Sequence, residues 1–249
     1  MELKDKTAIV TGGASGIGLA ITNLFVAQGA NVHVLEVKED VKIGENDPAI
    51  TVHQCDVSNH QQVRDVIGKI TEAEELNILV NNAGIAKVGN IEHTSEEDLD
   101  RLYSVNIKGI FNCVQASIGA LKKSKGCILN MASVISHVGI PDRFAYSMTK
   151  GAVLTMTYSI AKDYIDDGIR CNSISPARVH TPFVDGYLAQ NYPGQEQEMF
   201  EKLSKTQPIG RMAKPEEIAE LALFLCSDKA GFITGTDYPI DGGFIKINN

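Results

Sequence analysis

The sequence lacks paired cysteines, long apolar runs and an excess of basic charge, and each absence excludes a class of protein. Its five cysteines are scattered and odd in number, at Cys55, Cys113, Cys127, Cys171 and Cys226. Their spacing fits neither a disulfide framework nor a zinc site. We therefore expect reduced thiols, as in a cytoplasmic protein.

Membrane and nucleic-acid partners are disfavoured on similar grounds. No run approaches the roughly 20 apolar residues that cross a bilayer, and the start MELKDKTAIV has no apolar core of a signal peptide. With 23 basic against 31 acidic residues the net charge is -8, which opposes broad binding to phosphate backbones or anionic lipid. We expect a small-molecule ligand.

Short apolar runs alternate with helical patterns along the 249 residues, as in a parallel sheet covered by helices on both faces. The predicted strands are at about Thr7 to Val10, Asn31 to Leu35, Ile50 to Gln54, Ile78 to Val80, Cys127 to Met131, Arg170 to Ile174 and Asp237 to Ile240. No repeat or linker interrupts them. We predict one α/β domain over residues 1–249, a doubly wound Rossmann-type fold with about seven parallel strands.

Local signals place two helix starts and one long irregular segment. Thr94 with Glu97 predicts a capping box ahead of a helix, and Pro215 predicts the first turn of another. Residues 181–207 mix proline, glycine and tyrosine with short helical pieces. Because such segments in compact domains are usually functional, we interpret this one as a substrate lid. The alternative is a passive surface insertion.

A glycine-rich turn, TGGASGIG from Thr11 to Gly18, follows the first predicted strand and opens the first helix. In that position Gly12, Gly16 and Gly18 let a dinucleotide pyrophosphate approach the backbone and the helix N-terminus. Taken alone, the turn also fits an ordinary strand-to-helix connection.

Glu36 ends the second predicted strand, where a carboxylate can accept hydrogen bonds from both ribose hydroxyls of a dinucleotide. The same charge repels the 2′-phosphate of NADP. Neither Ser15 nor Val37 supplies a compensating positive charge, although Lys38 lies close in sequence. These residues favour NAD.

Tyr146 and Lys150 are four residues apart in RFAYSMTKGAV, so a helix places both side chains on one face. A neighbouring ammonium and a positive nicotinamide both lower the pKa of a tyrosine, and the phenolate can then act as a base. Taken alone, such a pair is more often two unrelated surface residues.

Several motifs together make the chain resemble the classical short-chain dehydrogenase/reductase family over essentially its whole length. They are TGGASGIG at Thr11, Asp56-Val57, NNAG at Asn81, Asn106, Ser133, Tyr146 with Lys150, SPARVHTP at Ser175, GRMAKPEEIAELALFLCSD at Gly210 and TGTDYPIDGG at Thr234. The resemblance implies NAD-dependent oxidation of a secondary alcohol to a ketone. It also implies a homotetramer packed through the helices that contain Asn106 and Tyr146.

The resemblance implies a role for each catalytic residue. Tyr146 would be the general base, and Ser133 would orient the substrate oxygen. Lys150 would lower the pKa of Tyr146, and Asn106 would hold a water that connects Lys150 with solvent. The implied cofactor-binding residues are Gly12, Ser15, Gly16, Ile17, Gly18, Glu36, Asp56, Val57, Asn82, Ala83, Gly84, Tyr146, Lys150, Val179 and Thr181.

Two arginines suggest an anionic substrate. Arg143 lies one helical turn before Tyr146, and Arg178 stands in Pro-Ala-Arg where the family commonly has Pro-Gly. Guanidinium groups bind carboxylates in bidentate geometry, and His180 would add a third donor. In the alternative interpretation, Arg143 pairs with Asp142 or Asp185 and Arg178 faces solvent.

Two classes of carboxylate substrate agree with these residues. The arginine before the tyrosine resembles the arrangement in dehydrogenases of 3-hydroxybutyrate. The stretch ARVHTPFVDGYL resembles that of sugar-acid enzymes such as 2-keto-3-deoxy-L-fuconate dehydrogenase. We favour the sugar acid, because its hydroxyls would find further polar partners. These would be Ser136, His137, His180, Asn191 and Tyr192.

The sequence disfavours two rival functions and a metal site. An NADPH-dependent 3-oxoacyl-carrier-protein reductase is opposed by Glu36 and the acidic charge. A non-catalytic, NAD-sensing protein of the same fold is opposed by the joint presence of the four catalytic residues. We expect no metal, because the remaining histidines show no ligand spacing and fit strand ends or surface positions. Among them are His33, His53, His60 and His93.

Overall fold

The computed structural model describes residues 1–39, 41–44 and 47–247. Its parallel sheet has seven strands in the order β3-β2-β1-β4-β5-β6-β7, which confirms the predicted fold class. The strands are β1 Thr7–Thr11, β2 Asn31–Glu36, β3 Ile50–Gln54, β4 Leu76–Asn81, β5 Cys127–Met131, β6 Arg170–Pro176 and β7 Asp237–Ile240.

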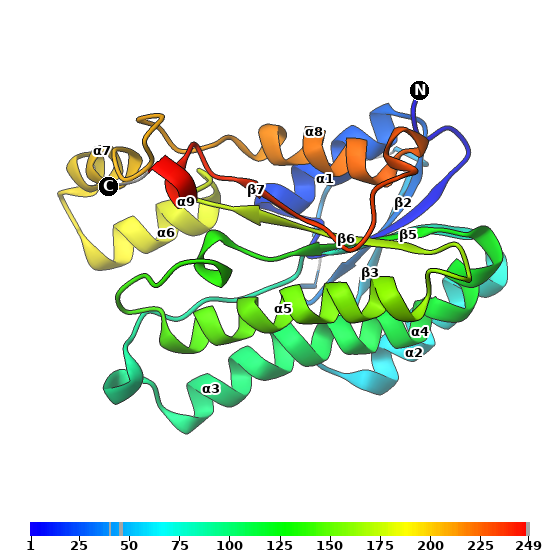
Figure 1. The fold of residues 1–249 in the computed structure, drawn as a ribbon, viewed down its shortest axis with the longest axis horizontal. Coiled ribbons are helices and arrows are strands. Elements are labelled where there is room, and N and C mark those ends of the chain that lie inside the picture. Colours follow the sequence, from blue (N-terminus) through cyan, green and yellow to red (C-terminus); the bar gives the residue numbers. More distant parts are fainter. Residues whose placement is uncertain (40, 45–46, 248–249) are drawn as a thin grey trace.

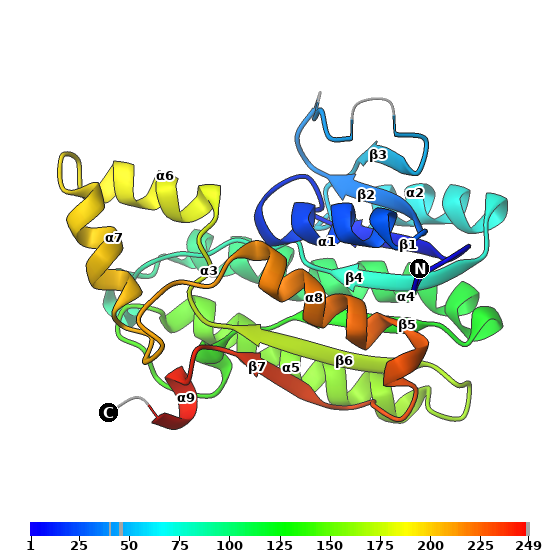
Figure 2. The same ribbon diagram turned by 90° about the horizontal axis from the view of Figure 1, so that it is seen from above.

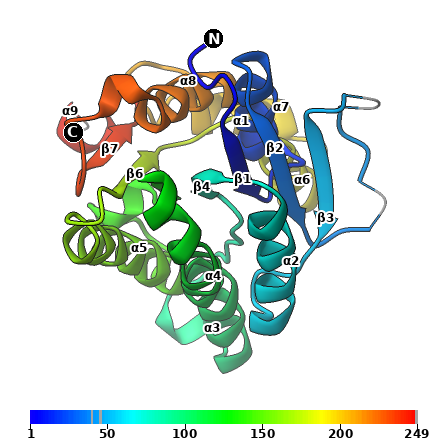
Figure 3. The ribbon, with the colours of Figure 1, turned by 90° about the vertical axis from the view of Figure 1, so that its right-hand side faces the viewer.

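Helices cover both faces of the sheet (Figure 3). One face carries α1 and α8, which pack against each other, and the other carries α2, α4 and α5. The helices are α1 Gly16–Ala27, α2 His60–Ala73, α3 Glu96–Tyr103, α4 Gly109–Ser124, α5 Phe144–Asp163, α6 Pro182–Asn191, α7 Glu196–Ser204, α8 Pro215–Cys226 and α9 Phe244–Ile247.

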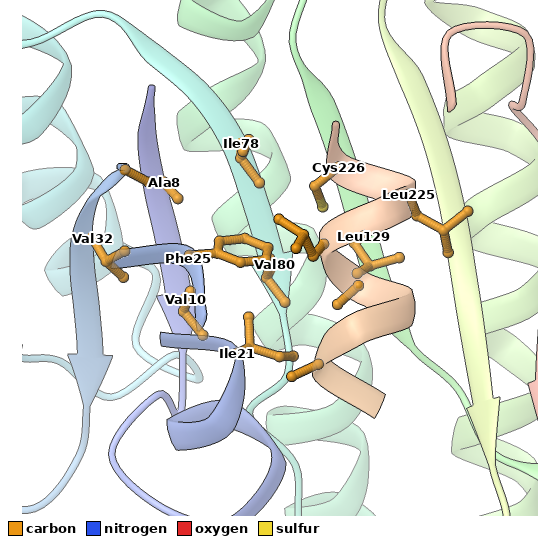
Figure 4. Packing of buried hydrophobic residues seen from close by; sticks show 14 of the residues in the cluster. Ala8, Val10, Ile21, Phe25, Val32, Ile78, Val80, Leu129, Leu225 and Cys226 are labelled. Carbon is orange, nitrogen blue, oxygen red and sulfur yellow. The ribbon is translucent and has the colours of Figure 1, made fainter. Parts of the chain in front are cut away.

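The central strands are apolar and buried along their whole length because helices cover both of their faces. Every residue of β1, β4 and β5 is buried. On the α1 and α8 side, Phe25 and Ile21 pack among Val10, Val80 and Leu129 (Figure 4). This packing gives the sheet a rigid edge from which loops can present side chains.

That edge is the one at which the parallel strands end. The chain leaves β1 toward β2 on one side and reaches β4 on the other, so a crevice opens where the order reverses. Helices α6 and α7 lie beyond the same edge (Figures 1 and 2). These two helices make up most of residues 181–207, the segment predicted as an irregular lid.

One of the two predicted helix starts is corrected. Helix α3 is capped by Ser95, whose hydroxyl accepts a hydrogen bond from the Asp98 amide at 3.1 Å. Thr94 instead donates its hydroxyl proton to the Asn90 carbonyl, so the predicted capping box begins one residue too early. Pro215 does open α8, as predicted.

His33 and His53 lie on the neighbouring strands β2 and β3. Their strands pair in parallel, so His33 Nδ1 and His53 Nε2 lie 2.9 Å apart, and His33 Nε2 lies 3.3 Å from Glu74. Within the described residues, no group of three or more histidine, cysteine or acidic side chains could hold a metal ion. None of the described helices is long and apolar enough to span a bilayer.

Candidate active site

A cavity of about 1150 Å³ opens at the carboxyl edge of the sheet, between the sheet, the start of α5 and the lid helices. It brings together residues predicted from distant parts of the sequence. The predicted residues that line it are Ile17, Asn82, Gly84, Ser133, Arg143, Tyr146, Lys150, Arg178, Val179 and Thr181.

The glycine-rich turn depends on its glycines. Gly12 and Gly16 have φ of 61° and 52°, where a side chain would be strained. A Cβ on Gly18 would lie 2.1 Å from the Gly12 carbonyl oxygen. Asn82, after β4, donates from Nδ2 to the carbonyls of Thr11 and Gly12 at 3.0 and 3.1 Å. The turn is thereby fixed against the neighbouring strand.

The turn and the first turn of α1 fit a dinucleotide pyrophosphate. Ser15 is the N-cap, yet its side chain makes no cap hydrogen bond within the described chain. The amides at this helix start can therefore serve an anion, which the helix dipole also favours. A Cβ on Gly16 would lie 3.2 Å from the Thr181 methyl, so the 179–181 loop faces the same turn.

The predicted adenosine end lies along β2 and β3. Glu36 ends β2, and its Oε1 accepts a hydrogen bond from the Val37 amide at 3.0 Å. Asp56 follows β3 and accepts from both the amide and the hydroxyl of Ser58, at 2.9 and 2.8 Å. Val57 is buried beside Asp56. The Glu36 carboxylate retains a second oxygen for a ribose hydroxyl.

Ser133 and Tyr146 meet at the cavity wall because β5 ends just before Ser133 and α5 begins just before Tyr146. Burial raises the pKa of Tyr146 to about 12. A side-chain hydrogen bond with Ser133 and the positive charge of Arg143 both act in the opposite direction. Each favours the phenolate over the phenol.

Lys150 lies one turn along α5 from Tyr146. Its Nζ donates to the Met131 carbonyl at 2.6 Å and lies 5.8 Å from the centroid of the Tyr146 ring. Burial lowers the pKa of Lys150 to about 8. The charge of Arg143 lowers the pKa of Tyr146, and the expected effect of Lys150 on that pKa stays a prediction.

Asn106 lies in a π-helical turn, Ser104–Lys108, that joins α3 to α4. Its Oδ1 accepts from the Ile85 amide, and its Nδ2 donates to the Ile85 carbonyl, both at 2.9 Å. Nδ2 also donates to Thr149, one residue before Lys150, at 3.0 Å. Asn106 therefore ties the loop after β4 to the helix that carries Tyr146 and Lys150.

The two predicted substrate arginines face one cavity, and neither finds a carboxylate partner among the described residues. Arg143 donates from Nη1 to the Asp142 backbone carbonyl at 2.8 Å. Burial and the charge of Arg143 lower the pKa of Arg178. The alternative pairing with Asp185 is not formed, because Asp185 accepts from His180 at 2.9 Å.

His180 does not join the arginines in the described cavity wall. Its side chain is exposed, pairs with Asp185 and packs edge-on against Phe200. Ser136, His137 and Tyr192 also lie outside that wall, and the Asn191 side chain falls outside the described part of the chain.

Polar side chains that the sequence did not single out line the cavity instead. They are Lys87, Tyr187, Gln190, Thr206 and Gln207. Tyr187 and Gln190 are three apart in α6, a spacing that places them on one face. The composition of residues 181–207 together with this helical spacing could have predicted Tyr187 and Gln190. No local sequence pattern marks Thr206 or Gln207 as cavity residues.

Comparison with known proteins decides the family. Residues 12–245 match the family model described as "Enoyl-(Acyl carrier protein) reductase". This match spans nearly the whole chain, including the glycine turn and the tyrosine and lysine of α5.

The chain belongs to the classical short-chain dehydrogenase/reductase family.

Family relatives cover the chain almost completely. Oxidoreductase UcpA of Salmonella typhimurium is 36% identical over 250 residues, or 97% of this chain and 95% of that protein. The structure of Thermoplasma acidophilum aldohexose dehydrogenase is 34% identical, with a TM-score of 0.91 over 97% of this chain and 94% of that one.

A second solved relative carries a cofactor. It is the 3-ketoacyl-(acyl-carrier-protein) reductase of Brucella melitensis complexed with NADH, which is 30% identical with a TM-score of 0.87 over 98% of this chain and 99% of that one. As a short-chain dehydrogenase/reductase, this chain is an oxidoreductase that uses a nicotinamide cofactor.

Proposed function

We propose that this oxidoreductase uses NAD to oxidise a secondary alcohol of a small carboxylate, with a deoxy-sugar acid related to 2-keto-3-deoxy-L-fuconate as the favoured substrate. The observation that carries the proposal is the convergence of Tyr146, Ser133 and two arginines without carboxylate partners on one cavity. A 3-hydroxybutyrate-type acid is the second candidate.

In the oxidation, Tyr146 takes the proton of the substrate hydroxyl while the hydride leaves from the same carbon. Ser133 donates to the substrate oxygen and holds it beside the Tyr146 hydroxyl. Bound oxidised nicotinamide would supply the hydride acceptor and a positive charge beside Tyr146. That charge opposes the effect of burial, which raises the pKa of Tyr146.

Lys150 suits the onward movement of the proton. Its pKa of about 8 lies near the working range, so its ammonium exchanges protons readily there. Asn106 hydrogen-bonds to the backbone of Ile85 and to the Thr149 hydroxyl. These bonds hold the loop after β4 against the part of α5 that carries Lys150.

The preference for NAD rests on Glu36. Its carboxylate ends β2 beside the glycine turn, where a 2′-phosphate would approach a like charge. Lys38 is the cation nearest in sequence, and it lines a smaller hollow with Glu39 and Gln54. Glu39 adds a second negative charge to that hollow, so Lys38 compensates poorly for the charge of Glu36.

The preference for a sugar acid rests on polar side chains that line the cavity around the two arginines. Tyr187, Gln190, Thr206 and Gln207 supply hydroxyl and amide groups around the arginines. A polyhydroxylated acid uses more of these groups than 3-hydroxybutyrate does. An acyl-carrier-protein reductase fits less well, because Glu36 disfavours NADPH and the charge of -8 repels an acidic carrier.

The Tyr146→Phe variant tests the proposed chemistry. Removing the hydroxyl removes the base but leaves the ring packing, so turnover should fall by about three orders of magnitude or more while NAD affinity stays within about twofold. NADH formation and NAD titration by calorimetry measure the two effects. Undiminished turnover would exclude Tyr146 as the base, and NAD binding without turnover in the wild type would favour a sensing protein.

We also propose a homotetramer packed through α4 and α5. Apolar side chains along these helices are exposed in the single chain, as expected for surfaces that another subunit covers. They are Phe111 on α4 and Phe144, Met148 and Tyr158 on α5.

A further inference from the structure

Arg178 has a fixed backbone and a long side chain that needs separate support. The Ala213 amide donates to the Arg178 carbonyl at 2.9 Å, and the Ala177 amide donates to Ile240 at 3.2 Å. These bonds connect the segment after β6 to parts of the chain outside the lid. They hold the Arg178 backbone but leave its guanidinium free to rotate.

The lid supplies the missing support through Thr206, which follows α7. Arg178 Nε donates to Thr206 Oγ1 at 3.1 Å. The threonine hydroxyl gives its own proton to the Leu203 carbonyl at 2.6 Å. Because that proton is committed to the helix end, the hydroxyl oxygen faces Arg178 as an acceptor.

This contact determines which edge of the guanidinium meets a ligand. With Nε engaged by Thr206, the terminal edge with Nη1 and Nη2 remains for a ligand. Both Arg178 and Thr206 line the cavity. Two parallel N–H groups on that edge match the two oxygens of a carboxylate.

We propose that Thr206 is a positioning residue that sets the preference for carboxylate substrates by holding Arg178 with its terminal edge toward the cavity. The inference rests on the proposed function and adds a specificity determinant from the lid. Fixing a long side chain in advance reduces the entropy lost on binding, so the contact strengthens binding without touching the reacting carbon.

The test compares Thr206→Val, which keeps the shape but removes the acceptor, with Thr206→Ser, which keeps the hydroxyl. Thr71→Val on α2 is the matched control, because Thr71 also donates to the carbonyl three residues before it but lies away from the described cavity wall. Arg178→Gln is the reference for loss of the guanidinium. Rates are measured with 3-hydroxybutyrate or the deoxy-sugar acid, whichever the wild type oxidises faster, and with the methyl ester of the same acid.

Thr206→Val should reduce the preference for the acid over its ester about tenfold, mainly through a higher KM, while Thr206→Ser and Thr71→Val resemble the wild type. Arg178→Gln should reduce that preference about a hundredfold. A normal preference in Thr206→Val beside a clear loss in Arg178→Gln overturns the inference and leaves the proposed function intact.

Other outcomes are equally decisive. A normal preference in Arg178→Gln overturns the carboxylate proposal itself. Equal losses for acid and ester in Thr206→Val, or failure of Thr206→Ser to restore the preference, assign Thr206 a purely structural role. If Thr206→Val has a lower melting temperature than Thr71→Val, Thr206→Ala replaces it in the same comparison.

Discussion

At the scale of single residues, Arg143 adds a positive charge beside Tyr146. Tyr146 is placed by the start of α5, and the same helix start places Arg143 three residues earlier. Burial raises the pKa of Tyr146, whereas Arg143 and Ser133 favour the phenolate. One arginine thus has two effects in this account, on substrate binding and on the base.

Arg143→Gln should shift the pH dependence of turnover. Oxidation requires the phenolate, so the rate rises with pH through the pKa of Tyr146, and losing a nearby positive charge raises that pKa. We expect the rising limb of kcat/KM for a neutral ester substrate to move to higher pH. Below the limb, the rate falls about tenfold for each unit of displacement.

The measurement is a pH profile of NADH formation at saturating NAD for the wild type, Arg143→Gln and Arg143→Lys. The lysine variant keeps the charge and should stay closer to the wild type. Superimposable limbs in the wild type and Arg143→Gln would show that Arg143 has no influence on the base.

At the scale of elements, the sequence predicts the strands better than the helices of the lid. The predicted bounds agree with the structure for β5, which is buried along its length, and for β3, which is largely exposed, whereas the buried β4 is longer than predicted at both ends. The lid was recognised from its composition, but α6 and α7 were not bounded, because their ends are exposed and their apolar residues are sparse.

The site residues also differ in how far the sequence predicts them. Ser133, Tyr146 and Lys150 lie close together in the sequence, so their spacing can be read from it directly. Thr206 acts on Arg178 across 28 residues, and such a contact exists only once β6 and the lid have folded together. His180 was predicted at the site, but its side chain pairs with Asp185 in α6 and lies outside the described cavity wall.

At the scale of the whole molecule, the exposed apolar residues of α4 and α5 should be covered by a second subunit. Light scattering at micromolar concentration should give about four times the chain mass of 26.9 kDa. Phe111→Asp and Tyr158→Asp together should shift the mass to a smaller species, because burying two carboxylates in an apolar interface is costly. A wild-type monomer would contradict the proposal.

The central claim is that the whole fold serves NAD-dependent oxidation of a small carboxylate. Initial NADH or NADPH formation at 340 nm tests it most directly, with deoxy-sugar acids, 3-hydroxybutyrate and neutral secondary alcohols offered with NAD and NADP in parallel. We predict turnover concentrated on the acids, with NAD preferred by about tenfold or more. Turnover confined to neutral alcohols would contradict the role of Arg143 and Arg178, and a preference for NADP would contradict the role of Glu36.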